Sequence, residues 1–336
     1  MSKRILLLLA HSIEEHDQLK LLSGLGYDVF SIGGYIDPAH PHDPKRPPLP
    51  DVPFHPDLKA AVDELGTPDN LDAAKRRIPD KILAWADTII CHHYEHTWLI
   101  PQWNIIRDRR VIWRTVGQSV EGNERAMAPL RDDGLQIVRY SPKEQNIPGY
   151  AGEDALIRFY KDPDDWKGWT GEEPVVINIT QHLRQRDPYT NWRFWEQATA
   201  GLNRLPLGPG SEAIGGPGEL TYDEMQGWLR RAAVYCYTGT QPASYTLGLI
   251  EALMTGIPTI SIGPSWMRIF PYGPALFEGA EIAGMAYEDP TEARKVIARF
   301  VDGDERLRGM GAAQRSRAID LFGKDAVQAA WAEFLS

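Results

Sequence analysis

Short apolar runs alternate with helical stretches along the chain, and this alternation restricts the fold more than any other feature. In the first half we predict strands at 4–10, 28–32, 87–92, 111–116 and 135–140, and helices at 14–25, 70–85, 97–108 and 121–132. Such alternation is typical of a parallel sheet covered by helices on both faces. A second series of the same kind begins at Val175.

The 336 residues are enough for two domains of about 150 residues each. After Tyr140 the sequence changes character, because two stretches rich in Gly and Pro, 146–150 and 161–171, look like a connection between domains. We therefore predict an α/β protein with two Rossmann-like domains. The expected boundaries are a first domain at 1–150, a linker at 151–172, a second domain at 173–320 and a final helical segment at 321–336.

Composition restricts the location and the partners of the chain. Both cysteines, Cys91 and Cys236, lie in apolar runs and read as core thiols of a reducing compartment. The apolar run at 4–10 is too short for a secretory signal, and no run approaches the roughly 20 apolar residues that span a bilayer. We therefore expect a cytoplasmic protein. The net charge of −10 argues against nucleic acid as a partner, and the arginines at 107–114 read as a solvated helix end.

The residues at 242–261 read as a loop, a short helix that carries Glu251, a Gly-Pro break and a buried strand. Free N–H groups in the first turn of such a helix, near Thr246 to Gly248, favour an anion. A carboxylate one turn further on can accept two hydrogen bonds from a ribose. Gly256 and Pro258 are typical of a helix end. The alternative is an ordinary helix-to-strand joint.

The order Glu251, Ala252, Gly256 and Pro258 resembles the donor-nucleotide loop of retaining GT-B glycosyltransferases, in particular family 4. Ala243 stands where that family has a first Glu, a loss that Gln241 or Ser244 could offset in part. The segments 218–235 and 282–322 resemble the neighbouring family segments. The resemblance implies a GT-B fold, in which the first domain binds the acceptor, the second binds the nucleotide sugar and the last helix crosses back to the first domain.

The resemblance also implies roles for individual residues of the second domain. Glu251 holds the donor ribose, and the diphosphate lies against the loop formed by Ser244, Tyr245, Thr246, Leu247, Gly248 and Leu249. Arg184 or Arg186 supplies a clamp on the diphosphate and stabilises the leaving group, although no Lys-Gly follows them as in the family. No metal and no cofactor is expected beside the nucleotide-sugar co-substrate, since the helix dipole and the arginines replace a metal.

Three histidines in the first half are further candidates. His92 and His93 end a strand where Rossmann-like sheets place ligand contacts, so one of them contacts the donor sugar or the acceptor, or is satisfied by a backbone carbonyl. His11 follows the first strand. In inverting GT-B enzymes a His near this place serves as general base with an Asp that orients it, and Asp17 is a conceivable partner. His40, His42 and His55 lie in a Pro-rich excursion and are not expected to bind a metal.

The function expected from these features is transfer of a sugar from a nucleotide-diphosphate donor to an acceptor hydroxyl, with retention and without a metal. One alternative is a non-catalytic nucleotide-sugar or partner-binding protein, which Ala243 favours. Another is an inverting transferase or an epimerase with His11 as base. A glycan, a lipid-linked or a small-molecule acceptor is favoured over nucleic acid. The acceptor, the nucleobase, the sugar and the oligomeric state are not fixed by the sequence.

Overall fold

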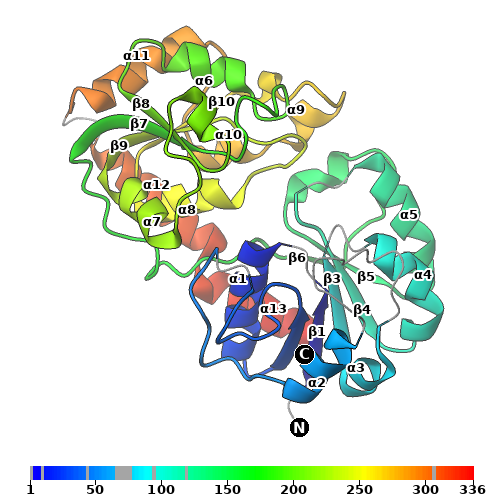
Figure 1. Cartoon of the computed structure of the whole chain (residues 1–336). Helices are drawn as coiled ribbons and strands as arrows, with labels where there is room; N and C mark the ends of the chain where they lie inside the picture. The colour runs from blue at the N-terminus through cyan, green and yellow to red at the C-terminus, as the bar shows by residue number, and fades with distance from the viewer. Residues whose placement is uncertain are drawn as a thin grey trace. The chain divides into compact units, whose positions relative to one another are not determined.

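The computed structural model describes residues 3–8, 11–42, 45–64, 78–92, 96–117, 120–304 and 308–336. The chain divides into two compact units, one of Met1–Tyr160 with Gln328–Ser336 and one of Lys161–Val327. Each unit is built around one parallel sheet with helices packed on it (Figure 1). The expectation of two α/β domains is therefore confirmed.

The first unit contains a six-stranded parallel sheet in the order β2-β1-β3-β4-β5-β6. Its strands are β1 (Arg4–Leu8), β2 (Asp28–Ile32), β3 (Thr88–His92), β4 (Arg110–Arg114), β5 (Gln136–Arg139) and β6 (Ala155–Leu156). Its helices are α1 (Ser12–Gly24), α2 (Pro56–Asp63), α3 (Asp80–Trp85), α4 (His96–Ile106) and α5 (Glu121–Asp132). Five of the strands fall on the runs predicted from the sequence. The sixth, β6, lies in the segment expected to be a linker and pairs with β5.

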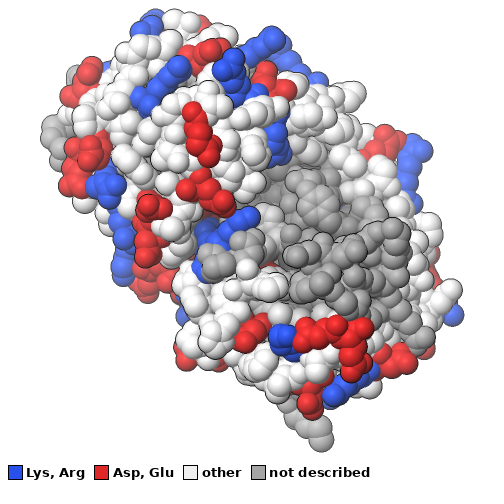
Figure 2. All heavy atoms as spheres, in the orientation of Figure 1, with Lys and Arg blue, Asp and Glu red and all other residues white. Residues whose placement is uncertain are grey.

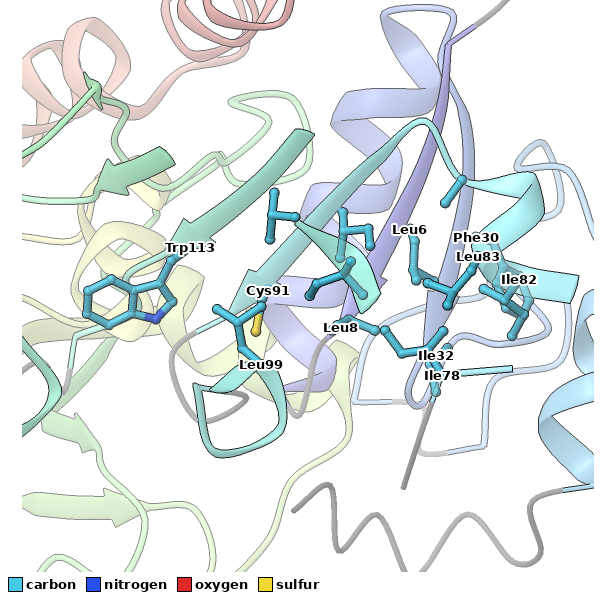
Figure 3. Packing of buried hydrophobic residues seen from close by; sticks show 14 of the residues in the cluster. Leu6, Leu8, Phe30, Ile32, Ile78, Ile82, Leu83, Cys91, Leu99 and Trp113 are labelled. Atoms are coloured by element: carbon cyan, nitrogen blue, oxygen red, sulfur yellow. The ribbon is translucent and has the colours of Figure 1, made fainter. Parts of the chain in front are cut away.

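One face of this sheet is covered by α2, α3, α4 and α5. Alternate strand residues such as Leu6, Cys91 and Trp113 point to that face and pack into a continuous apolar cluster with Leu83 and Leu99 of the helices (Figure 3). Trp113 is fully buried there. The period-two alternation in β4 places its neighbours Arg110 and Arg114 on the opposite face.

The opposite face receives the last helix of the chain, α13 (Lys324–Leu335). The guanidinium carbon of Arg114 lies 5.8 Å from the centroid of the Trp331 ring, and that of Arg110 lies 4.8 Å from the Phe334 ring. Lys3 Nζ also donates to the carbonyl of Leu335 at 2.6 Å. Since residues from Gln328 onward belong to the first unit, the expected return of the last helix to the first domain is confirmed.

The position of Arg114 differs from what the sequence predicted. The arginines at 107–114 were expected to be solvated, but Arg114 is fully buried. Its guanidinium donates to the carbonyl oxygens of Arg139, Ile157 and Arg158. The reason is that Arg114 lies in β4, in the interior of the sheet, and satisfies the carbonyl group at the end of β5 and two that follow β6.

The second unit contains a five-stranded parallel sheet in the order β11-β10-β9-β7-β8. Its strands are β7 (Glu173–Ile179), β8 (Arg204–Leu207), β9 (Ala232–Tyr237), β10 (Thr259–Ile262) and β11 (Ala286–Tyr287). Its helices are α6 (Trp192–Ala198), α7 (Tyr222–Arg231), α8 (Leu247–Thr255), α9 (Gly273–Leu276), α10 (Gly279–Ala283), α11 (Pro290–Val301) and α12 (Arg308–Phe322). Helix α8 packs against α12, α7 and α10, while α11 packs against α6 and the strands β7 and β9.

The bounds of α8 follow from its sequence. Thr246 is the N-cap, and its Oγ1 accepts the N–H of Leu249 at 3.3 Å. The helix ends at Gly256, which has φ of +92°, a left-handed conformation that favours glycine. Pro258 and β10 follow. The predicted helix end is therefore confirmed, and the segment is a helix between two strands of the second sheet.

Candidate functional site

The first turn of α8 lies at the carboxyl edge of the second sheet. A Cβ built on Gly248 would lie 3.7 Å from the carbonyl oxygen of Ile179, the last residue of β7, and 3.7 Å from the Tyr235 hydroxyl. The carboxyl edge of a parallel sheet is where α/β proteins bind their ligands. Gly248 therefore leaves open a place at this edge that a larger side chain would fill.

Two backbone donors of this turn are open. In the described part of the chain, the N–H groups of Leu247 and Gly248 have no acceptor, and both residues are partly exposed. The N–H of Leu249, in contrast, is taken by Thr246 Oγ1, and the Leu249 side chain is fully buried. The open donors of the predicted loop are thus concentrated at the beginning of the helix, where the helix dipole favours an anion.

Ser244 and Tyr245 support the loop from inside. The carbonyl of Ser244 accepts the N–H groups of Glu278 and Gly279 at 3.0 and 2.9 Å. The Tyr245 ring, which is buried, packs edge-on against Phe322 with the centroids 5.3 Å apart. Both residues therefore hold the backbone before α8 in place.

Gln241 joins three loops at the same edge. Its N–H donates to the carbonyl of Tyr189 at 2.7 Å, and its Nε2 donates to that of Pro188 at 3.0 Å. Its Oε1 accepts the N–H of Ile269 at 2.9 Å. Gln241, one of the two side chains that could offset Ala243 in part, is thus engaged with the loops after β7 and β10, a role that sequence reasoning missed.

Asn191 adds a second link between the loop after β7 and the loop after β9. Its Nδ2 donates to the carbonyl of Thr238 at 2.8 Å. Together with Gln241, this bond holds the segment that carries Arg184 and Arg186 beside the residues that lead into α8. Strands β7 and β9 are neighbours in the sheet, which explains why the two loops meet.

Arg184 and Arg186 carry unneutralised charge on that segment. Arg184 is exposed and Arg186 is half-buried, and neither lies within 4.0 Å of a carboxylate in the described residues. The guanidinium of Arg184 lies 5.9 Å from the centroid of the Trp192 ring. Both cations therefore remain available to an anionic ligand.

Glu251 lies one turn after the open donors and is buried. Its Oε1 is 2.7 Å from Nζ of Lys161, and the two side chains are 3% and 0% exposed. The pKa of Tyr235 is raised, mainly by burial and in part by the charge of Glu251. Sequence reasoning placed Lys161 in the linker, and nothing in the spacing relates it to Glu251.

His92 is the best-defined candidate of the first unit. It ends β3 and is 2% exposed, and neither ring nitrogen has a hydrogen-bond partner in the part of the chain that the structure describes. Burial lowers the pKa of His92 well below its usual range, and Arg114 and His11 lower it further. The ring is therefore neutral at physiological pH. His93, the other candidate at this strand end, lies outside the described residues.

His11 caps α1. Its Nδ1 accepts the N–H of Glu14 at 3.4 Å, so in the neutral ring the hydrogen is on Nε2, which is a donor in this tautomer. The expected partner, Asp17, has its carboxylate 3.1 Å from Nδ1 of the neighbouring His16. His11 follows β1 and His92 ends β3. These strands are adjacent in the sheet, which explains the electrostatic interaction between the two histidines.

No group of three or more His, Cys, Asp or Glu residues that could hold a metal ion occurs in the described ranges. The histidines of the Pro-rich excursion have separate partners. His40 lies 3.4 Å from Asp37, and His55 lies 3.0 Å from Asp28. Cys91 and Cys236 are buried thiols, as expected.

The surface carries both signs of charge. On the face drawn in Figure 2, Lys and Arg are interspersed with Asp and Glu. No helix among the described residues is long and apolar enough to cross a membrane.

Comparison with known proteins identifies the fold. No family model matches the chain, and no curated protein matches it. Among solved structures, a sucrose-phosphate synthase from Thermosynechococcus elongatus has a TM-score of 0.65 at 14% identity, with 99% of this chain and 98% of that chain covered. HepE of Anabaena, in complex with UDP and glucose, has a TM-score of 0.65 at 12% identity and 98% coverage of both chains. A glycosyltransferase from Rickettsia africae has a TM-score of 0.66 at 12% identity, with 99% and 97% covered. Over nearly its whole length the chain therefore has the two-domain α/β fold of GT-B glycosyltransferases.

Proposed function

We propose that the protein is a glycosyltransferase that moves a sugar from a nucleotide-diphosphate donor to an acceptor hydroxyl. One observation carries this proposal: the open N–H groups of Leu247 and Gly248 lie at the carboxyl edge of the second sheet, in a loop held beside the unneutralised Arg184 and Arg186. Backbone donors at a helix N-terminus, together with arginines, are what a diphosphate requires. Solved proteins of the same fold bind UDP and UDP-glucose.

The second unit would bind the donor. The diphosphate would lie against the first turn of α8, with Arg184 or Arg186 on its oxygens, and Glu251 would accept hydrogen bonds from the ribose. These positive groups stabilise the charge that develops on the leaving diphosphate, so the reaction needs no metal and no cofactor beside the co-substrate. We propose that retention of the anomeric configuration accompanies this arrangement.

The first unit would present the acceptor. Neutral His92, at the end of β3, can donate or accept a hydrogen bond without carrying charge. In the neutral ring of His11 the lone pair is on Nδ1, which accepts the Glu14 N–H, so His11 would serve as a base only if this cap opened. An inverting reaction with His11 as general base is the second candidate mechanism. A glycan, a lipid-linked or a small molecule is the acceptor class that we favour.

The buried position of Ala243 favours one further candidate, a nucleotide-sugar binder without catalysis. Ala243 is 7% exposed and brings no carboxylate or hydroxyl to the loop. Such a protein would bind the nucleotide sugar as tightly as the nucleotide but would neither transfer nor hydrolyse the sugar.

Calorimetric titration tests the proposal with UDP, GDP, ADP and their glucose conjugates. We expect the protein to bind the nucleotides of one base. Glu251→Gln should lower the affinity for these nucleotides about tenfold, because it removes a hydrogen bond to a charged group. Slow hydrolysis of the sugar conjugate in the presence of EDTA would support a metal-independent enzyme. If none of the nucleotides binds, the proposed donor site is wrong. Binding without any turnover would favour the non-catalytic candidate.

A further inference from the structure

Lys161, which forms a buried ion pair with Glu251, is the strongest feature of the second unit that the proposed function leaves without a role. The ammonium of Lys161 lies 2.7 Å from Glu251 Oε1, and both side chains are almost completely excluded from solvent. Exposed Lys–carboxylate pairs are common and contribute little. A buried pair differs, because each charge loses its hydration and depends on the other.

Lys161 is itself held firmly. It is the first residue of the second unit, and its backbone N–H donates to the carbonyl of Phe322 at 2.9 Å. The Phe322 ring packs against Tyr245 of the loop before α8. The ammonium also lies 5.8 Å from the centroid of the Trp166 ring, close enough for a cation–π contribution. Lys161 thus approaches Glu251 from a segment that is fastened to the same loop.

The hydrogen bond from Lys161 orients the carboxylate of Glu251. Lys161 Nζ donates to Oε1 at 2.7 Å, and a hydrogen bond between two charged groups is stronger and more directional than one between neutral groups. A carboxylate has about four lone-pair positions, so a carboxylate of this kind can accept from an ammonium and from a diol at the same time.

We propose that Lys161 is a positioning residue of the donor site, which orients Glu251 as the acceptor for the ribose hydroxyls of the nucleotide. This inference rests on the proposed function. It assigns Lys161 an effect on one part of the nucleotide, the ribose, and none on the base or the phosphates. That selectivity separates the proposal from a purely structural ion pair.

The test compares nucleoside diphosphates with their 2′-deoxy forms by calorimetry. UDP, GDP and ADP are titrated first, and the base that binds is taken further with its 2′-deoxy diphosphate. The variants are Lys161→Met, Glu251→Gln and the double variant. Lys167→Met is the matched control, because Lys167 follows on the same segment and makes an exposed pair with Asp164.

We expect the wild-type protein to prefer the ribonucleotide about tenfold, the cost of one charge-assisted hydrogen bond. Lys161→Met and Glu251→Gln should each reduce this preference to near one. The double variant should lose no more than either single variant, since both act on the same contact. Lys161→Arg, which keeps the charge, should retain most of the preference, and Lys167→Met should retain all of it.

Each outcome distinguishes the proposals. If no nucleotide binds the wild-type protein, the proposed function fails and this inference fails with it. If Glu251→Gln removes the preference but Lys161→Met leaves it intact, only the role of Lys161 is overturned. Should Lys161→Met not fold, Lys161→Gln takes its place with the same expectation, because the shorter and uncharged Gln side chain does not reproduce the charged contact with Glu251.

Discussion

Arg139 and Glu124 form a buried, two-bond ion pair in the first unit. The Nη1 and Nη2 atoms of Arg139 donate to the two carboxylate oxygens of Glu124 at 2.6 and 2.7 Å, and both side chains are fully buried. Glu124 Oε2 also accepts the N–H of Ala151 at 2.9 Å, and Arg139 donates to the carbonyl of Gly152. The pair therefore fastens α5 and the segment before β6 to β5.

Removal of Glu124 should strongly destabilise the first unit. Glu124→Ala leaves the Arg139 guanidinium buried without its carboxylate, and breaking such a pair costs about 3–5 kcal/mol of unfolding free energy. Denaturant unfolding measures the loss. Glu121→Ala is the control on the same helix, because Glu121 pairs with Arg125 on the surface, where a pair contributes about 1 kcal/mol or less. Equal effects of the two substitutions would contradict the importance of burial.

Glu144 should make the stability of the first unit depend on pH. Burial raises the pKa of Glu144 from 4.5 to about 7, although Arg139 and a hydrogen bond from Thr115 lower it in part. The folded state therefore binds the proton more tightly than the unfolded state. The stabilisation is fully present below pH 4.5 and is lost as the pH rises to about 7. Its total is roughly 3 kcal/mol.

The variant Glu144→Gln isolates this effect. The amide oxygen of Gln can still accept from the Thr115 hydroxyl and the Tyr140 N–H, which now lie 2.9 and 3.1 Å from Glu144 Oε2. We expect the variant to show a flatter stability profile between pH 4.5 and 7, with the largest gain over wild type above pH 7. A difference between the two proteins that stays constant over this range would show that another group titrates.

The local features of the fold could be predicted from the sequence because they depend on neighbours along the chain. The apolar runs predicted the strands, and Thr246, Gly256 and Pro258 indicated where α8 begins and ends. The helix-to-strand segment that carries Glu251 could be located for the same reason. A helix cap and a left-handed glycine each need only a few adjacent residues.

The partners of the charged residues could not be predicted. Lys161 and Glu251 are 90 positions apart, and only the packing of the second unit brings them together. Arg114 reads as one of several surface arginines, yet the register of β4 turns it towards α13. Gln241 likewise finds its partners on two other loops. The partners of charged and amide side chains depend on tertiary structure, and tertiary contacts produce no periodic pattern in the sequence.

Gly248 offers a test of the open helix end that separates binding from stability. The Cβ of Gly248→Ala would meet its nearest neighbours at 3.7 Å, an ordinary contact, so the fold should accept it. Alanine is favoured over glycine in a helix by up to about 1 kcal/mol, and the melting temperature should stay constant or rise. The added methyl group should nevertheless lower the affinity for the nucleoside diphosphate about tenfold, because it occupies the approach to the backbone donors.

The control for Gly248→Ala is Gly309→Ala near the beginning of α12, where a Cβ would meet no atom within 4 Å. It should change stability in the same direction and leave nucleotide affinity unchanged. Calorimetry and thermal unfolding on both variants provide the comparison. If Gly248→Ala binds the nucleotide as well as the wild-type protein does, the diphosphate does not lie at this helix end.

Arg184 and Arg186 should act on the phosphates alone. Each substitution by Ala removes a possible charge-assisted contact, and a hydrogen bond between charged groups contributes about 1.5–3 kcal/mol, which is roughly a 10- to 100-fold change in affinity. The arginine that clamps the diphosphate should show this loss for the nucleoside diphosphate and a much smaller one for the monophosphate of the same base. Arg193→Ala is the control, because Arg193 is 79% exposed and lies 3.8 Å from Asp187 on the same stretch. A loss of equal size for both nucleotides would indicate that the arginines only shape the loop, since an effect on the backbone between β7 and α6 does not distinguish one phosphate from two.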